Sequence, residues 1–215
     1  MKTRQVKSDE LRAATAEFMH RLYKRGLTTT SGGNISARED NIIAVTPSAS
    51  DKGKMQAEEV GMVDINGEII GHKFKPSIET GLHLSIYKAR NDVMAVIHAH
   101  PTFCSLYSVT NEEINHRLLS ETYAILGHIE YVPYYKIGSP ELAEAVAEAA
   151  TKADCIIMRN HGALATGKSL LQAYDRLEVL ESAAKINWLA RSFPAEAIRE
   201  LPLERLDELD KLMGR

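Results

Sequence analysis

The chain alternates between short apolar runs and longer stretches in which apolar residues recur every three or four positions. Residues 8–25 show this helical spacing, with Leu11, Phe18 and Leu22 on one face. The same spacing predicts further helices over residues 75–90, 102–109, 139–152, 169–191 and 201–213. Short apolar or β-branched runs predict strands over residues 41–46, 60–70, 93–99, 129–132 and 154–158. The sequence therefore predicts a mixed α/β protein.

Polar residues and glycines mark where several of these elements begin and end. Residues 8–10 (Ser-Asp-Glu) are typical of a helix start, and Gly26 is typical of a helix end. Residues 75–79 (Lys-Pro-Ser-Ile-Glu) predict a second helix start, with the serine as the cap. The dipeptide Asn66-Gly67 predicts a hairpin, so the early strands are expected to be antiparallel. Residues 111–127 give no clear prediction.

Composition refines this picture mainly by excluding classes of protein. The 215 residues are 44% hydrophobic and 26% charged, which suits a folded chain rather than a disordered one. No repeat, low-complexity tract or flexible linker divides the chain, so we expect a single domain over residues 1–215. The net charge of −3 gives no electrostatic case for binding nucleic acid or an anionic membrane.

Cysteine usage and hydropathy bear on the compartment. Cys104 and Cys155 are the two cysteines of the chain and allow one disulfide at most. No run approaches the roughly 18 continuous apolar residues of a membrane span, and residues 1–25 lack the apolar core of a signal peptide. We therefore expect a cytoplasmic protein with no membrane partner.

The strand predicted at residues 93–99 carries the most distinctive chemistry. It leads into His98-Ala99-His100-Pro101, where the two histidines are separated by one small residue. Because residues i and i+2 of a strand point to the same face, His98 and His100 should project side by side. Two imidazoles at a strand end are half of a metal site, although an isolated pair is more often merely hydrogen-bonded.

Other polar turns are ambiguous when taken singly. Residues 28–36 form a hydroxyl-rich, double-glycine turn that could bind an anion or be an ordinary tight turn. Residues 46–50 form a second turn of the same kind. His161 lies between Asn and Gly and, taken alone, would be a surface histidine. His83 lies one helical turn after Glu79, and we expect it to be packed and hydrogen-bonded rather than a metal ligand.

Five motifs in a fixed order resemble the class II aldolase/adducin family. They are Ser31-Gly32-Gly33-Asn34, Thr46-Pro47-Ser48, Lys75-Pro76-Ser77-Ile78-Glu79, His98-Ala99-His100-Pro101 and Asn160-His161-Gly162. The resemblance runs from the first helix to the helix after Gly167 and implies a three-layer α/β/α fold around a mostly antiparallel sheet. It also implies a homotetramer with four-fold symmetry and active sites between neighbouring subunits.

The resemblance assigns roles to residues by position. It implies that His98, His100 and His161 bind one zinc ion per subunit, or another divalent transition metal. Glu79 matches the catalytic carboxylate, which can also bind the metal when substrate is absent. Tyr134 matches a tyrosine that donates a proton in the adjacent subunit's site. The positions that match the substrate-binding loops are Gly33, Asn34, Ser48, Ala49, Ser77 and Ile78.

The chemistry implied by the resemblance is reversible aldol cleavage of a sugar phosphate. The metal would polarise the carbonyl of a ketose 1-phosphate, similar to L-fuculose 1-phosphate, and stabilise an enediolate when the C3–C4 bond breaks. The products would be dihydroxyacetone phosphate and an aldehyde. Glu79 would exchange the carbon proton, and Tyr134 the proton of the aldehyde oxygen.

Several alternatives stay open on the sequence. Ile78 and Ala49 stand where the aldolases have serine and glycine, and the stretch after Leu201 lacks the aldolases' tail tyrosine, so the substrate and its phosphate are uncertain. The family also contains methylthioribulose-1-phosphate dehydratases, sugar-phosphate decarboxylases and L-ribulose-5-phosphate 4-epimerases, of which the epimerases have Asp at the position of Glu79. An adducin-like interaction domain is the non-enzyme alternative, but such domains have lost their zinc ligands.

Overall fold

A single seven-stranded sheet forms the middle of the molecule. The computed structural model describes residues 2–214, with their side chains from residue 7 onward. The strands are β1 (Asn34–Glu39), β2 (Ile42–Val45), β3 (Gly61–Val63), β4 (Ala95–Ala99), β5 (Ile129–Val132), β6 (Cys155–Met158) and β7 (Gly162–Gly167). Their order across the sheet is β3-β2-β1-β4-β7-β6-β5. Only β5 and β6 pair in parallel; the other neighbours are antiparallel.

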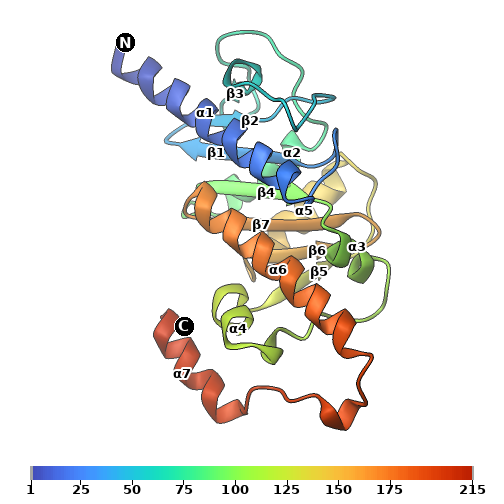
Figure 1. Ribbon diagram of the computed structural model, residues 1–215. Coiled ribbons are helices and arrows are strands. Elements are labelled where there is room, and N and C mark those ends of the chain that lie inside the picture. The colour runs from blue at the N-terminus through green and yellow to red at the C-terminus, as the bar shows by residue number, and fades with distance from the viewer. Residues whose placement is uncertain (1, 215) are drawn as a thin grey trace.

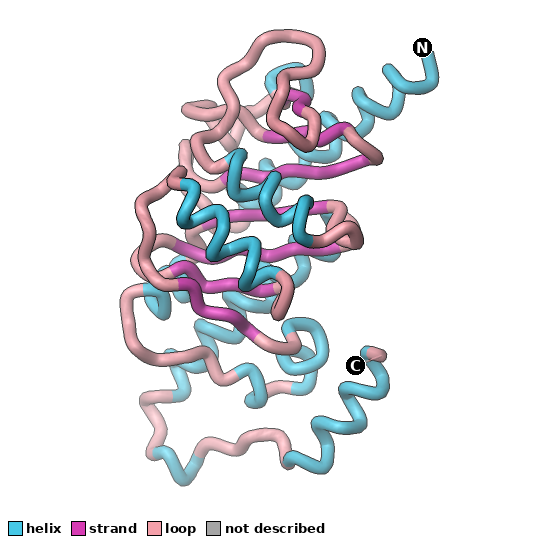
Figure 2. Tube along the Cα trace, turned by 180° about the vertical axis from the view of Figure 1, so that it is seen from behind, coloured by secondary structure: helices cyan, strands magenta, loops and turns pink. Residues whose placement is uncertain are grey.

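Helices cover both faces of this sheet. The helices of the described residues are α1 (Lys2–Lys24), α2 (Thr80–Ala89), α3 (Thr102–Ser108), α4 (Ser120–Leu126), α5 (Pro140–Ala150), α6 (Leu170–Ala190) and α7 (Leu203–Met213), of which α7 lies away from the sheet, beside α4 (Figure 1). Helices α1 and α6 cross the sheet on the side that faces the viewer in Figure 1. In the opposite view, two helices, α2 and α5, lie over the sheet (Figure 2). The expected three-layer α/β/α fold with a mostly antiparallel sheet is confirmed.

The alternation of side chains along β4 explains the two-sided core. Ile97 belongs to the apolar cluster beneath α1 and α6, whereas Val96 belongs to the cluster beneath α2 and α5. Both clusters are buried, so a central strand must be apolar on both faces. His98 has the same parity as Val96 and therefore lies on the α2 side of the sheet. This register is what turns the histidine toward Glu79.

Several element boundaries differ from those that the sequence predicted. Helix α1 begins at Lys2, so residues 8–10 are not its start; residues 2–7 contain no helix breaker and simply extend it. Its end is as predicted: Gly26 has a φ of +70°, and the N–H of Leu27 bonds the carbonyl of Leu22 at 3.0 Å in a Schellman-type end. Helix α4 lies in the stretch that gave no prediction.

The hairpin expected at residues 60–70 is reduced to one strand and a bridge. β3 pairs with β2, and beyond the turn only Ile69 forms a bridge, to Val63. The Asp64 carboxylate accepts the N–H groups of Asn66 and Glu68, both at 2.9 Å, and so stabilises the turn itself. The returning arm still bonds to the first: Asp64 N–H donates to the Glu68 carbonyl and Ile70 N–H to the Met62 carbonyl, both at 2.9 Å. The antiparallel turn therefore forms, but its second arm is not a regular strand.

The turn after β2 contains a strained alanine. Ala49 has a φ of +53°, in the left-handed region where a Cβ is unfavourable. This explains physically why glycine would be suited to that position.

We expect Ala49→Gly to raise the free energy of unfolding by about 0.5–1 kcal/mol, because relief of strain exceeds the added flexibility of the unfolded chain. Ala13→Gly on an exposed helical position is the matched control and should lower it by about 1 kcal/mol. Urea denaturation of the three proteins measures both effects. If Ala49→Gly were as destabilising as Ala13→Gly, the strain would not exist.

Candidate metal site

The antiparallel sheet brings three separate loops to one edge. Asn34, at the start of β1, is paired with His98 near the end of β4. On the other side of β4, Ala99 is paired with Ala163 at the start of β7. The turn that carries His161 immediately precedes β7. The end of β4 therefore meets the beginnings of both neighbours, although the residues are far apart in the sequence.

The three histidines form one compact cluster. One ring nitrogen from each of His98, His100 and His161 lies within 4.8 Å of the others. The ring centroids of His98 lie 4.7 Å from those of both His100 and His161, and the latter two are 5.7 Å apart. The sequence prediction that His98 and His100 project side by side agrees with this geometry. His161 is not a free surface histidine.

The orientation of His98 is fixed by a hydrogen bond on its outer side. Its Nδ1–H donates to the carbonyl of Ala163 at 2.9 Å, so the proton is on Nδ1 and the lone pair is on Nε2. That Nε2 is buried and has no hydrogen-bond partner among the described residues. A buried imidazole with an unsatisfied acceptor that faces two other imidazoles is a typical arrangement for a metal ligand.

Glycine allows the close approach of the loops at two points. A Cβ on Gly162 would lie 2.7 Å from both the Ala99 carbonyl oxygen and Cδ2 of His100. Gly33 has a φ of +66°, and a Cβ there would lie 2.7 Å from the His98 carbonyl oxygen. Gly162 belongs to the Asn160-His161-Gly162 motif, but the motif alone does not indicate this close approach. The Ala99 carbonyl and the His100 ring leave no room for a side chain at position 162, which explains why glycine is required there.

Glu79 closes the cluster from the helix side. Its carboxylate is 6% exposed, with Oε1 3.2 Å from Nε2 of His161 and Oε2 3.4 Å from Nε2 of His98. Asn34 Nδ2 donates to Oε2 at 2.8 Å. The sequence predicted Glu79 in the first turn of a helix over residues 75–90. The structure instead places it immediately before α2, which begins at Thr80. The N–H of Thr80 bonds the Ser77 carbonyl at 3.0 Å, and this preceding turn aims the carboxylate at the histidines.

Electrostatics favour neutral imidazoles beside a charged carboxylate. Burial lowers the pKa of His98 to about 3 and also lowers the pKa of His100. Burial alone would raise the pKa of Glu79, but the neighbouring His98 and His161 and the Asn34 amide outweigh it and hold that pKa below its usual value. Neutral imidazole and ionised carboxylate are the forms that bind a metal.

These residues fit a divalent metal ion. Three nitrogen donors and one carboxylate are the donor set of a zinc-type site. A divalent ion would also satisfy the buried lone pair on Nε2 of His98, which has no hydrogen-bond partner. No side chain of the site is a cysteine, since Cys104 and Cys155 are both buried elsewhere in the core.

The loops predicted to bind substrate also meet near this edge. The N–H of Ser48 bonds the Lys75 carbonyl at 2.9 Å, and Asn34 Nδ2 lies 3.3 Å from Oγ of Ser77. Ile78 is 64% exposed beside them. Tyr134 lies on the loop after β5 and is 63% exposed, so its side chain is free to contact another molecule.

Lys52 is a buried cation that sequence reasoning missed. Its side chain is 1% exposed, and its ammonium donates to the Pro47 carbonyl at 2.9 Å and to Ser50 Oγ at 3.0 Å. Its own N–H bonds the Thr30 carbonyl at 2.8 Å, which ties the loop before β1 to the loop after β2. Burial lowers the pKa of Lys52 to about 8. The run Ser50-Asp51-Lys52-Gly53 looks like any solvated turn in the sequence.

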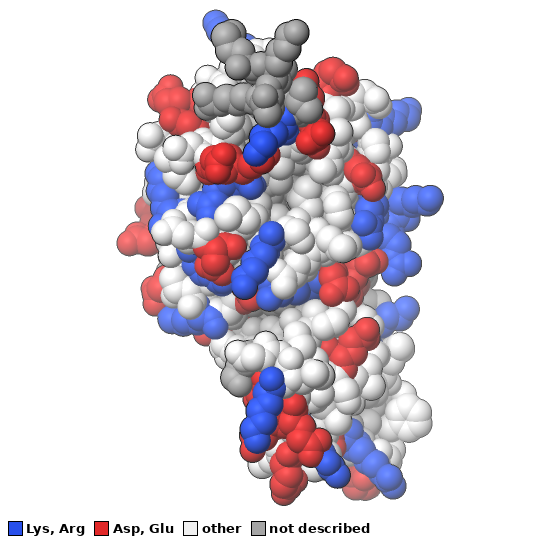
Figure 3. Space-filling model, turned by 90° about the vertical axis from the view of Figure 1, so that its left-hand side faces the viewer, with Lys and Arg blue, Asp and Glu red and all other residues white. Residues whose placement is uncertain are grey.

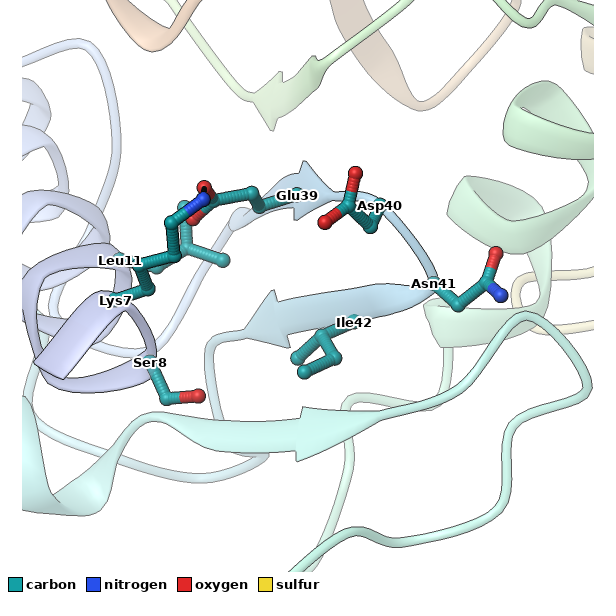
Figure 4. Close-up of a pocket in the computed structure, with 7 residues that line it drawn as sticks. All are labelled: Lys7, Ser8, Leu11, Glu39, Asp40, Asn41 and Ile42. Atoms are coloured by element: carbon teal, nitrogen blue, oxygen red, sulfur yellow. Dashed lines mark hydrogen bonds and ion pairs between the residues drawn. The ribbon is translucent and has the colours of Figure 1, made fainter. Parts of the chain in front are cut away.

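Other surface features lie away from this edge. A pocket between α1 and the β1–β2 turn contains the Lys7–Glu39 ion pair, whose atoms are 2.7 Å apart (Figure 4). Glu39 is at the opposite end of β1 from Asn34.

On the face shown in Figure 3, acidic and basic side chains are interspersed rather than gathered by sign. No helix among the described residues has the length and apolarity to span a membrane.

Comparison with known proteins gives this geometry a family. The model of the class II aldolase and adducin N-terminal domain matches residues 13–188. The chain belongs to this family. The resemblance inferred from the five motifs is thereby confirmed, and so is the expectation of an enzyme of the class II aldolase type.

Curated relatives in the family have more than one activity. An L-fuculose phosphate aldolase of Methanocaldococcus jannaschii is 41% identical over 173 residues, which cover 80% of this chain and 93% of the relative. A 3-oxo-tetronate 4-phosphate decarboxylase of Haemophilus influenzae is 36% identical over 169 residues, with 76% and 80% covered.

Solved structures extend the likeness to nearly the whole chain. An L-fuculose 1-phosphate aldolase has a TM-score of 0.85 at 28% identity and covers 96% of this chain and 97% of its own. YgbL from Escherichia coli has a TM-score of 0.87 at 27% identity, with 94% and 98% covered.

We expect the protein to bind about one divalent transition-metal ion per chain. His98→Ala should lose stable metal binding, because too few donors remain to hold the ion. His128→Ala is the matched control: that histidine is exposed and pairs with Glu130. Metal analysis after dialysis against trace zinc measures both. Equal metal content in the two variants would exclude the cluster as the site.

The pH dependence of stability gives a second check, made on metal-free protein. Burial lowers the pKa of His83 to about 4, below the 6.5 of an unfolded histidine. Between these values only the unfolded chain binds the proton, so stability is lost as the pH falls from 6.5 toward 4. We expect His83→Gln to reduce the slope of the free energy of unfolding against pH, between pH 6.5 and 4, by about 1.4 kcal/mol per pH unit. Denaturant unfolding at pH 7, 6 and 5 measures it, and an unchanged slope would contradict a neutral buried His83.

Proposed function

We propose that this protein is a zinc-dependent aldolase that reversibly cleaves a ketose 1-phosphate to dihydroxyacetone phosphate and an aldehyde. The observation that carries the proposal is the convergence of three imidazoles on one buried carboxylate at the end of β4. Relatives named L-fuculose phosphate aldolase at 38–41% identity support the reaction type and the class of substrate.

The proposed roles follow from charge and position. A divalent ion held by His98, His100 and His161 would supply a Lewis acid that polarises a substrate carbonyl. Glu79, kept ionised in the site, exchanges a proton with the reacting carbon. The loops around Asn34, Ser48 and Ser77 bind the phosphate through hydroxyl and backbone N–H groups, remote from the bond that breaks. No Schiff-base lysine is needed.

Tyr134 and the oligomer belong to the same proposal. The exposed side chain of Tyr134 is suited to donate a proton in the active site of a neighbouring subunit. The proposed assembly is a homotetramer whose active sites lie at the subunit interfaces. The neighbouring Tyr135 is different, since it packs against the apolar core beneath α2 and α5. Tyr135→Phe is therefore a matched control for Tyr134→Phe.

A second candidate is decarboxylation of a keto-acid sugar phosphate at the same site. The relative from Haemophilus influenzae with that activity favours it. Ile78 bears on the substrate rather than on the reaction, because a side chain without a hydroxyl at this exposed position offers the substrate no hydrogen-bond donor. The two reactions differ in their products rather than in the metal site.

The deciding experiment supplies the zinc-loaded protein with L-fuculose 1-phosphate, other ketose 1- and 5-phosphates, 3-oxo-tetronate 4-phosphate and methylthioribulose 1-phosphate. Dihydroxyacetone phosphate with an aldehyde supports the aldolase. Release of carbon dioxide identifies the decarboxylase, and loss of water a dehydratase. Absence of every product with a fully loaded site would contradict an enzyme of this class.

We expect Glu79→Gln to keep most of the metal, because three imidazoles remain, but to lower kcat by about 10²–10⁴-fold, because the proton acceptor is lost. Glu144→Gln on the exposed face of α5 is the control and should have ordinary kcat. Steady-state kinetics and metal analysis on the same samples measure both. Normal turnover by Glu79→Gln would exclude it as the base.

We expect Tyr134→Phe to lower kcat for cleavage by about 10²-fold at unchanged metal content, because a proton donor to the aldehyde oxygen is lost. Tyr135→Phe should leave kcat within a factor of about two, since it removes no group from the site. If the two variants had equal rates, Tyr134 would have no part in the mechanism.

A further inference from the structure

A line of polar residues is buried between β1 and α2, behind the metal site. Asn34 and Ser36 share one face of β1. Glu79 directly precedes α2, and His83 and Tyr87 follow it within the helix at four-residue spacing. Two residues of a strand advance by roughly 6.6 Å and four residues of a helix by roughly 6.0 Å, so the two rows stay in step. Side chains from the strand and the helix can therefore alternate.

The contacts form a continuous chain. Tyr87 Oη lies 2.8 Å from Ser36 Oγ, which lies 2.6 Å from His83 Nδ1. His83 Nε2 lies 2.6 Å from Asn34 Oδ1, and Asn34 Nδ2 lies 2.8 Å from Glu79 Oε2. All five side chains are buried. The expectation that His83 is packed and hydrogen-bonded rather than a ligand is consistent with these contacts.

The chemistry of the groups determines the direction of every bond. Asn34 Oδ1 can only accept, so His83 must carry its proton on Nε2. Burial lowers the pKa of His83 to about 4, so the ring is neutral and its Nδ1 accepts from Ser36. Ser36 then accepts from Tyr87, whose pKa is raised by burial so that the phenol keeps its proton. Every donation points toward Glu79.

We propose that Tyr87, Ser36 and His83 are positioning residues that fix the Asn34 amide with its NH₂ group toward Glu79 and so hold the carboxylate turned into the metal site. This inference deepens the proposed function, because Glu79 is its base. A flipped Asn34 would place its carbonyl oxygen against the ionised carboxylate of Glu79, and neither group has a proton to donate. His83 prevents the flip, because its Nε2–H requires an acceptor. Aligned donors also favour the negative charge on Glu79.

The direct test is made on metal-free protein without substrate. Histidine ¹⁵N NMR should show His83 neutral, protonated on Nε2 and unprotonated on Nδ1. Hydrogen exchange of the Asn34 side-chain amide should be slow in the native protein and accelerated at least tenfold in His83→Leu, while backbone amides of β1 stay protected. His83→Gln can donate to Asn34 and accept from Ser36, so it should restore slow exchange.

Metal affinity and kinetics give the second readout. His83→Leu should weaken Zn²⁺ binding or lower kcat by about 10- to 100-fold with little change in KM, and His83→Gln should recover most of the loss. Tyr87→Phe removes one hydroxyl at the far end and should have a smaller effect in the same direction. Tyr131→Phe, which removes a phenol bonded to the Ile114 N–H elsewhere, is the matched control.

Three results would overturn the proposal. They are a His83 proton on Nδ1 alone, equal exchange of the Asn34 side chain in the native protein and in His83→Leu, and equal effects of Tyr87→Phe and Tyr131→Phe on Zn²⁺ affinity. If His83→Leu does not fold, the tautomer and the two tyrosine variants decide the question. These NMR and Zn²⁺ measurements do not depend on the substrate, so failure of the aldolase assay alone would leave the positioning chain standing.

Discussion

The structure depends on the antiparallel pairing of β4 with a neighbour on each side. Because β1 and β7 both run opposite to β4, their first residues lie beside its last ones. That single topological fact gathers Asn34, His98 and His161 at one edge of the sheet. Hydrogen bonds offset part of the cost of burying their polar atoms, but Nε2 of His98 and Nδ1 of His161 are buried without a hydrogen-bond partner, as is Oε1 of Glu79 beside them.

Periodicity gave most of the architecture, because the core strands are apolar and the helices have clear apolar faces. The prediction was wrong where local chemistry competed with the pattern. Asp64 accepts two backbone N–H groups of the turn, and the second arm of the expected hairpin forms a single bridge instead of a regular strand. Ser77 Oγ accepts the N–H of Glu79 at 3.3 Å in a turn before α2, so Glu79 lies ahead of the helix. The spacing of apolar residues along the sequence does not reveal such side chain–backbone bonds.

The same contrast holds within the site. The spacing of His98 and His100 was sufficient to place both on one face, because a strand has a period of two. His161 could be added only by the order of motifs, since its turn is distant in sequence. The row Glu79-His83-Tyr87 had a visible four-residue spacing, but its match to Asn34 and Ser36 depends on how α2 packs on β1. Lys52 gave no signal in the sequence, because burial of a turn lysine follows from the contact of the loop after β2 with the loop before β1.

The most direct test of the account is a crystal structure of the protein grown with zinc, with anomalous scattering recorded at the zinc absorption edge. The account predicts one strong peak per chain, roughly 2.0–2.1 Å from Nε2 of His98 and from one ring nitrogen each of His100 and His161. A well-ordered site without a peak, or a peak bound by other residues, would contradict it.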